Sequence, residues 1–184
     1  MGAARLEDLD DVLVDLIAQP LDWFFAEHYR HRQFCALVSD LAAAPAFDGE
    51  RLTRIVDFLR HDLLLHFIDE EEDLFPLLRR RALPEDDIEA ALGRLSAEHR
   101  ADVAQAEIVR GALEICLAER RPPSSDPALR KDLRDFAAHE LRHLALENAV
   151  VLPIARLRLT ERDLAGLSRR LAARRGLVLQ AQGA

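Results

Sequence analysis

Hydrophobic residues recur along most of the chain at intervals of three and four residues, the period of a helix with one buried face. Prolines and a Pro-Pro-Ser-Ser segment interrupt this pattern and mark the ends of the helices. On the third long block, the apolar stripe places Leu95, His99 and Val103 on the buried side. The long blocks predict four helices, at about 21–43, 49–81, 84–119 and 128–157.

Two shorter blocks flank these helices. They predict a leading helix at about 6–18 and a last helix at about 160–175, with Thr160 as N-cap of the latter. Four long helices joined by short connections are typical of an antiparallel up-down four-helix bundle. We therefore expect an all-α fold and a single domain over 1–184, with a bundle core at about 20–157.

Composition narrows the class of protein. The chain has 184 residues, 49% of them hydrophobic and 32% charged, which is typical of one globular domain. Its net charge of −8 argues against nucleic acid as a partner, because phosphate binding needs a positive face. No apolar stretch is long enough to span a membrane, and the acidic start does not resemble a secretory signal. With only two cysteines, Cys35 and Cys116, we predict a cytoplasmic protein with no membrane partner.

Two His-x-x-x-Glu pairs interrupt the apolar stripes, His66 with Glu70 and His143 with Glu147. Residues four apart lie on one helix face, so each pair is placed on the core-facing side. A buried carboxylate costs several kcal/mol unless it is paired or bound to a metal. These pairs could be structural ion pairs, but they favour a buried metal site.

The pattern around the pairs is duplicated. The second His-x-x-x-Glu follows the first by 77 residues, and each is followed by a proline ten positions after its histidine. An Ala-Glu-His triplet ends at His28 and again at His99, 71 residues later. The repeat predicts pseudo-twofold symmetry, with four imidazoles and two carboxylates around a shared centre. Such a mixed set favours two iron or manganese ions over a closed structural zinc site.

These residues resemble a known family. The segments that carry the resemblance are 27–35, 66–76, 98–99 and 143–153, and they are similar in kind and order to the hemerythrin-like, HHE cation-binding domain of the bacterial branch. The resemblance covers about 20–154 and implies a non-haem di-iron site with an oxo or hydroxo bridge, for which manganese or zinc could substitute. It implies that one iron is held by His28 and His66, the other by His99 and His143, and that both are bridged by Glu70 and Glu147.

The function implied is binding or sensing of a diatomic ligand, oxygen or nitric oxide, or of iron. Oxygen-carrying hemerythrins place an aspartate five residues after the last histidine, where this chain has Asn148, so pure oxygen carriage is not favoured. An oxidase, a peroxidase or an iron-handling or repair enzyme on the same site is the alternative. The excess of histidine over carboxylate favours binding over catalysis. The sequence is compatible with a homodimer and does not define the oligomeric state.

Other polar residues near the stripes are weaker candidates. His139 lies one turn before His143 and is either a fifth ligand or a hydrogen-bonding neighbour, and His31 is a less favoured ligand. Glu71 is a candidate to hold a ligand in place. His61 is out of phase with the stripe and is expected at the surface, and Cys35 is expected to be a core residue rather than a redox thiol.

Overall fold

The computed structural model describes residues 16–179, and these form helices and no strand. The helix expected at 6–18 falls almost wholly outside them. The elements are, in chain order, α2 (Pro20–Ala43), α3 (Gly49–Asp57), η1 (Phe58–Asp62), α4 (Leu63–Ile68), η2 (Asp69–Leu74), α5 (Phe75–Arg81), η3 (Pro84–Asp86), α6 (Glu89–Glu119), η4 (Pro123–Ser125), α7 (Pro127–Leu146), η5 (Glu147–Val151), α8 (Leu152–Arg158) and α9 (Glu161–Arg174).

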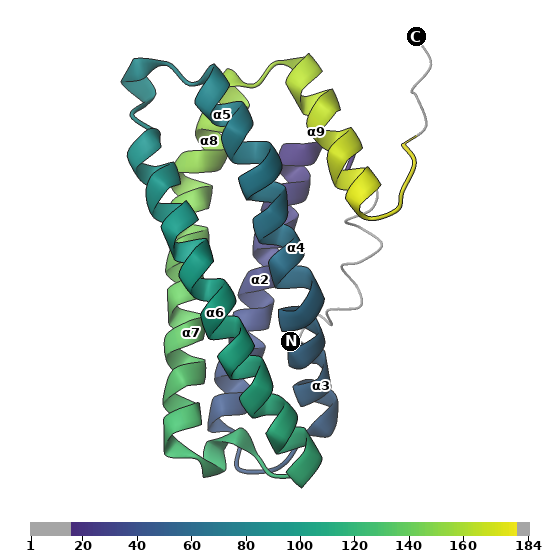
Figure 1. Ribbon diagram of the computed structural model, residues 1–184, viewed down its shortest axis with the longest axis vertical. Coiled ribbons are helices and arrows are strands. Elements are labelled where there is room, and N and C mark those ends of the chain that lie inside the picture. Colours follow the sequence, from purple (N-terminus) through teal and green to yellow (C-terminus); the bar gives the residue numbers. More distant parts are fainter. Residues whose placement is uncertain (1–15, 180–184) are drawn as a thin grey trace, which may run out of the picture.

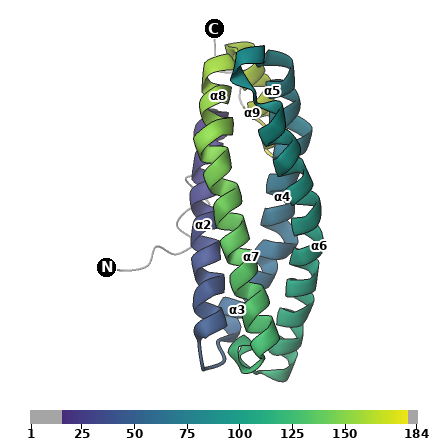
Figure 2. The ribbon, with the colours of Figure 1, turned by 90° about the vertical axis from the view of Figure 1, so that its left-hand side faces the viewer.

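Several of these elements join end to end. The backbone stays helical at every junction from α3 to α5, so residues 49–81 form one long helix, as the hydrophobic pattern predicts. Likewise α7, η5 and α8 form a second continuous helix over residues 127–158. Together with α2 and α6 they make four rods that alternate in direction, which confirms the all-α antiparallel bundle (Figures 1 and 2).

The core divides into two apolar clusters. One cluster includes Phe34, Leu59, Leu113 and Leu133. The other lies toward the end of the bundle formed by α5 and α8, and it contains residues of all four long helices and of α9. Most of the buried polar residues lie along the chain between members of the two clusters, so a polar layer separates two apolar ones. Apolar packing on both sides holds that layer away from water.

One predicted core position is wrong. Val103 is 37% exposed, whereas its neighbour Asp102 is buried. A helical period of 3.6 lets either the third or the fourth residue after His99 face inward, and α6 turns the third one in. The carboxylate of Asp102 therefore occupies the buried position at which the hydrophobic pattern predicted Val103.

The last helix begins as the sequence predicts. Thr160 and Asp163 form a capping box at the start of α9, and Asp163 also accepts a hydrogen bond from Nε of Arg81 at 2.7 Å. Figure 1 shows α9 running along the end of the bundle beside the α2 and α4–α5 rods. No helix among the described residues has both the length and the apolarity needed to cross a membrane.

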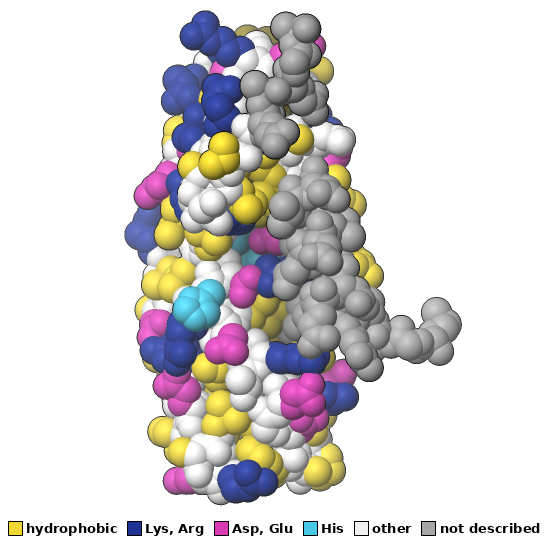
Figure 3. Space-filling model, turned by 90° about the vertical axis from the view of Figure 1, so that its right-hand side faces the viewer, with side chains coloured by type: hydrophobic (Ala, Val, Ile, Leu, Met, Phe, Trp, Pro, Cys, Tyr) yellow, Lys and Arg dark blue, Asp and Glu magenta, His cyan; other side chains and the backbone are white. Residues whose placement is uncertain are grey.

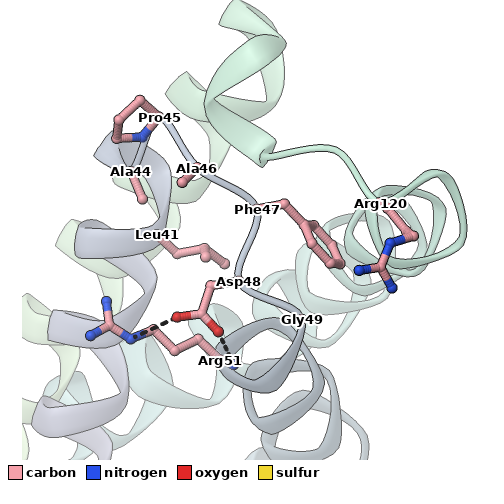
Figure 4. A pocket seen from close by; sticks show the side chains of 9 residues that line it. All are labelled: Leu41, Ala44, Pro45, Ala46, Phe47, Asp48, Gly49, Arg51 and Arg120. Carbon is pink, nitrogen blue, oxygen red and sulfur yellow. Dashed lines mark hydrogen bonds and ion pairs between the residues drawn. The ribbon is translucent and has the colours of Figure 1, made fainter.

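A surface pocket lies at the other end, where α2 turns into α3 (Figure 4). Asp48 caps α3 there by accepting from the backbone N–H of Arg51, and Phe47 lies under the guanidinium of Arg120. The nearest α2 residue in its wall, Leu41, is about 20 Å along the helix from His28 at 1.5 Å per residue. This pocket is therefore separate from the polar layer.

Candidate metal centre

Each His-x-x-x-Glu pair lies where an α-helix changes to a π-helix. Glu70 is the second residue of η2, and Glu147 is the first residue of η5. A proline follows each segment, Pro76 in α5 and Pro153 in α8. Because proline removes one helical hydrogen bond and crowds the carbonyl four residues before it, a widened turn ahead of it relieves the clash. The duplicated proline thus shapes the turn that carries each glutamate.

The structure brings all six predicted ligands into the polar layer. They are His28, His66, Glu70, His99, His143 and Glu147, and none is more than 3% exposed. They form two groups of four, and within each group the candidate ligand atoms lie within 4.8 Å of one another. His28 and His66 belong to one group and His99 and His143 to the other, while Glu70 and Glu147 belong to both.

Glu70 spans the two groups. Its Oε1 lies 3.5 Å from Nε2 of His28, and its Oε2 lies 3.3 Å from Nε2 of His99. Nε2 of His66 is 3.7 Å from the second of these oxygens. A carboxylate whose oxygens face histidines of both groups has the placement of a bridging ligand.

Glu147 has the matching position on the opposite helix. Its Oε2 lies 3.5 Å from Nε2 of His28, and its Oε1 lies 2.9 Å from Nε2 of His143. Nε2 of His99 and Nε2 of His143 are themselves 2.9 Å apart. Six side chains from four helices therefore converge through the atoms that bind metals best.

In three of the histidines, the ring nitrogen that faces away from the centre, Nδ1, has a hydrogen-bond partner. Nδ1 of His99 donates to Glu71 Oε1 at 2.7 Å, and Nδ1 of His143 donates to Glu98 Oε2 at 3.0 Å. Nδ1 of His28 lies 3.0 Å from the amide oxygen of Asn148. Each partner accepts a hydrogen bond, so the proton is placed on Nδ1 and the lone pair of Nε2 is left facing the centre. This is the role expected for Glu71.

The pKa values of the histidines shift in opposite directions. Burial lowers the pKa of His66 to about 3. Burial also lowers the pKa of His99 and His143, but hydrogen bonds and charge from the surrounding carboxylates outweigh it and raise these pKa values to about 9 and about 10. Protonation of His99 and His143 therefore competes with cation binding at these two rings.

The two central glutamates also differ. Burial raises the pKa of Glu70, yet the adjacent histidines together hold it well below its usual range. Burial and the negative charge of Glu70 raise the pKa of Glu147. One carboxylate thus stays ionised and the other resists a second negative charge, which is how two close carboxylates behave when no cation lies between them.

The unpaired atoms test whether a metal fits. Both oxygens of Glu70 and of Glu147, and Nε2 of His28 and of His66, are buried and make no well-aligned hydrogen bond in the described part of the chain, although histidine nitrogens lie within ion-pair distance of both carboxylates. A buried polar atom without a hydrogen-bond partner lowers the stability of the fold by about 1–3 kcal/mol. Cations between them would satisfy all six atoms at once, and nitrogen and carboxylate ligands suit iron, manganese and zinc. The residues fit a two-metal site.

Three of the remaining sequence candidates, His139, His61 and Cys35, lie apart from the two groups. His139 is one-third exposed, and its Nε2 lies 3.2 Å from Asp102. Among residues 16–179 it belongs to no cluster of candidate ligands. His61 is exposed, as predicted. Cys35 and Cys116 are buried free thiols, and burial raises the pKa of Cys35, which confirms a core role over a redox one.

Sequence reasoning missed or undervalued three residues. Glu98 holds His143, and the duplicated Ala-Glu-His triplet was the signal that could have identified it. Glu27, in the first copy of that triplet, is buried beside His31 and groups with His66. The spacing of Glu27 and His31, four residues apart on the same helix, was visible in the sequence.

Comparison with known families agrees with this geometry. The pattern of the hemerythrin HHE cation binding domain matches residues 19–155. The chain belongs to the hemerythrin HHE cation-binding family. All six candidate ligands lie within the matched HHE segment, and α9 lies outside it. No curated protein and no solved structure is similar enough to the chain to count as a match.

Proposed function

We propose that this HHE protein holds two non-haem iron ions and uses them to bind or sense a diatomic ligand, oxygen or nitric oxide. The proposed ligands are His28, His66, Glu70, His99, His143 and Glu147, with both glutamates bridging. The observation that carries the proposal is the convergence of the buried, unpaired carboxylates on Nε2 atoms from both groups. Family membership supports the binding of a cation.

Iron, when bound, supplies the open coordination positions and the redox chemistry that reversible binding of a small ligand needs. The protein supplies a dry enclosure. Phe67 stacks on His99 with ring centroids 4.3 Å apart, and Phe75 is parallel to the same ring at 5.8 Å. Phe24, whose ring centroid is 6.2 Å from that of His66, and Leu95 are fully buried as well. This packing excludes water and bulky molecules from the polar layer.

An apolar pocket on the surface reaches one of the proposed ligands. It has a volume of about 350 Å³ and is lined by Leu64, Phe67, Ile68, Val103 and neighbouring residues of η2 and α6. Of the six proposed ligands it reaches His99 alone, and that histidine is 3% exposed. An organic substrate in this pocket contacts only His99 of the six proposed ligands, whereas a diatomic molecule needs far less displacement of the packed Phe67 and His99 rings to reach the centre. Binding is therefore favoured over oxidation of an organic substrate.

The cytoplasmic location is part of the same proposal. Two buried thiols that form no disulfide suit a reducing compartment. Manganese or zinc could replace iron on the same ligands, because the set contains no group that selects against them.

The test begins with the metal content of protein expressed with iron and with its optical spectrum. We expect about two iron ions per chain. Anaerobically reduced protein is then mixed with oxygen or with nitric oxide in a stopped-flow spectrometer. The proposal expects a rapid spectral change with each gas and no need for a co-substrate. Repeated turnover with release of peroxide or an oxidised product would instead show an enzyme, and a protein that binds no iron would refute the metal centre.

A further inference from the structure

A third group of candidate ligands lies beside the centre. Glu27, His31 and His66 place ligand atoms within 4.8 Å of one another, and none of these residues is more than 3% exposed. Glu27 and His31 come from α2 and His66 from α4, the same two rods that supply His28 and His66 to the first of the two groups described above. The cluster therefore adjoins that group and shares one histidine with it.

His31 has no role in the two-metal centre that accounts for its burial. Both of its ring nitrogens are buried and have no hydrogen-bond partner among the described residues. Its ring lies between Phe58, with centroids 4.8 Å apart, and His66, at 4.3 Å. A neutral imidazole always has one lone pair to offer and one N–H to donate, so a histidine buried with neither satisfied indicates a missing ligand.

Glu27 supplies a carboxyl group. Its side chain is buried, and its Oε1 lies 3.5 Å from Nη1 of Arg30, at the limit of a hydrogen bond. The guanidinium of Arg30 also binds Asp62, so Arg30 is shared between two carboxylates. A cation bound by Glu27 and His31 would satisfy the buried carboxylate and the unpaired ring together.

His66 is the shared member and differs from the other three histidines. Nδ1 of His28, His99 and His143 is held by a partner, whereas both nitrogens of His66 are unpaired. No hydrogen bond from the described residues therefore fixes the orientation of its ring. Because a neutral imidazole binds one cation at a time, His66 can serve the third group or the first, but not both at once.

We propose that Glu27, His31 and His66 form a third cation position. Because both positions use His66, a cation occupies either this position or the His28–His66 position, and not both at once. A divalent cation such as Fe²⁺ is held there on its way into or out of the centre, and His66 passes it across. This inference rests on the two-metal centre proposed above. It predicts that the cluster controls the rate of metal exchange and leaves the final number of bound metals at two.

The first test measures uptake of Co²⁺, whose absorption reports its ligands, by metal-free protein. His31→Phe and Glu27→Gln should still bind two Co²⁺ ions but load them about tenfold or more slowly, the lower end of the effect of removing a group that supports a metal site. His61→Phe, an exposed histidine on the helix facing α2, is the matched control and should load normally. Circular dichroism checks that each variant is folded.

Unchanged loading in both variants would overturn the inference. Binding of only one Co²⁺ by His31→Phe would also overturn it, because His31 would then be a permanent ligand. If the unmodified protein itself fails to bind two Co²⁺ ions, the two-metal centre is wrong, so the two failures are distinguishable.

A second test isolates the position. The His28→Phe substitution removes a ligand from the first group. His66 is then available to the third cation position, because the His28–His66 position no longer competes for it. A Co²⁺ ion should then bind at Glu27, His31 and His66, with anomalous diffraction placing it there. His28→Phe/His31→Phe should bind one Co²⁺ fewer than His28→Phe. Equal binding by the two variants would contradict the third position.

Discussion

Arg175 donates a hydrogen bond from Nη2 to Oδ2 of Asp69 at 2.6 Å, and Asp69 is the residue immediately before Glu70. Arg174 donates to Asp69 as well and to Asp73 at 2.8 Å. Asp69 is fully buried, and the guanidinium of Arg175 also lies 4.3 Å from the centroid of the Trp23 ring. The end of α9 therefore fastens the π-helical turn that carries a central glutamate, although α9 lies outside the matched HHE segment.

Arg175→Ala should destabilise the protein by about 1–3 kcal/mol, because it removes a donor from a buried carboxylate whose remaining donor among residues 16–179 is Arg174. It should also weaken Co²⁺ binding, since η2 then keeps fewer contacts to the end of α9. Urea unfolding of the metal-free protein and Co²⁺ titration measure the two effects. Arg169→Ala, an exposed arginine on the same helix, should change neither. Equal effects of the two substitutions would show that the contact to Asp69 is unimportant.

Replacing the carboxylates behind the histidines should weaken metal binding without removing a ligand. Glu71→Ala and Glu98→Ala each leave the Nδ1 of His99 or of His143 without its acceptor. Because such partners orient the ring and raise its basicity, we expect metal affinity to fall about 10- to 100-fold. Competition with a chelator gives the affinity. Glu85→Ala, at an exposed position, serves as the control, and an affinity equal to that of the control would contradict this role.

The bridging assignment predicts joint loss of both metals. Glu70→Ala or Glu147→Ala removes a carboxylate whose oxygens face both groups of histidines, so both ions should be lost or strongly weakened. His139→Ala should keep two ions, because His139 contacts Asp102 and belongs to neither group. Elemental analysis counts the ions. Loss of one ion only in a glutamate variant would show that the carboxylate is a terminal ligand.

Glu140 should make the metal-free protein less stable as the pH rises. Burial, and then the charge of Asp102, raise the pKa of Glu140 from 4.5 to about 8 in the folded state. Above pH 4.5 the unfolded chain loses this proton while the folded chain keeps it, so stability declines from about pH 4.5 up to about pH 8.

Glu140→Gln removes that ionisation and keeps the shape of the side chain. We expect it to be more stable than the unmodified protein by about 4 kcal/mol at pH 8 and equal to it near pH 4.5. Urea midpoints at the two pH values measure the difference. Glu119→Gln, at an exposed position, is the control and should show no such dependence. A constant difference between the two pH values would mean that Glu140 is already ionised.

The arrangement of the helices could be predicted from the sequence because it depends on local signals. The 3.6-residue repeat, the breaking prolines and the Thr160 cap each act within a few residues of chain, and residues 49–81 form one helix as expected. The six candidate ligands were predictable for a related reason. A charged side chain on an apolar stripe is costly unless it has a partner, and its duplication 77 residues later indicated where that partner lies.

What holds and surrounds the candidate centre depended on contacts between distant parts of the chain. Nothing local to Asp69 indicates Arg175, more than 100 residues later, and nothing local to His31 indicates His66. A single stripe also could not decide between Asp102 and Val103, because both lie within the angular range that a helix can turn inward. The sequence by itself determined which helices form and which polar residues need partners. Only the tertiary structure decided which partner each one meets, since that depends on how four rods rotate and shift when their apolar faces pack together.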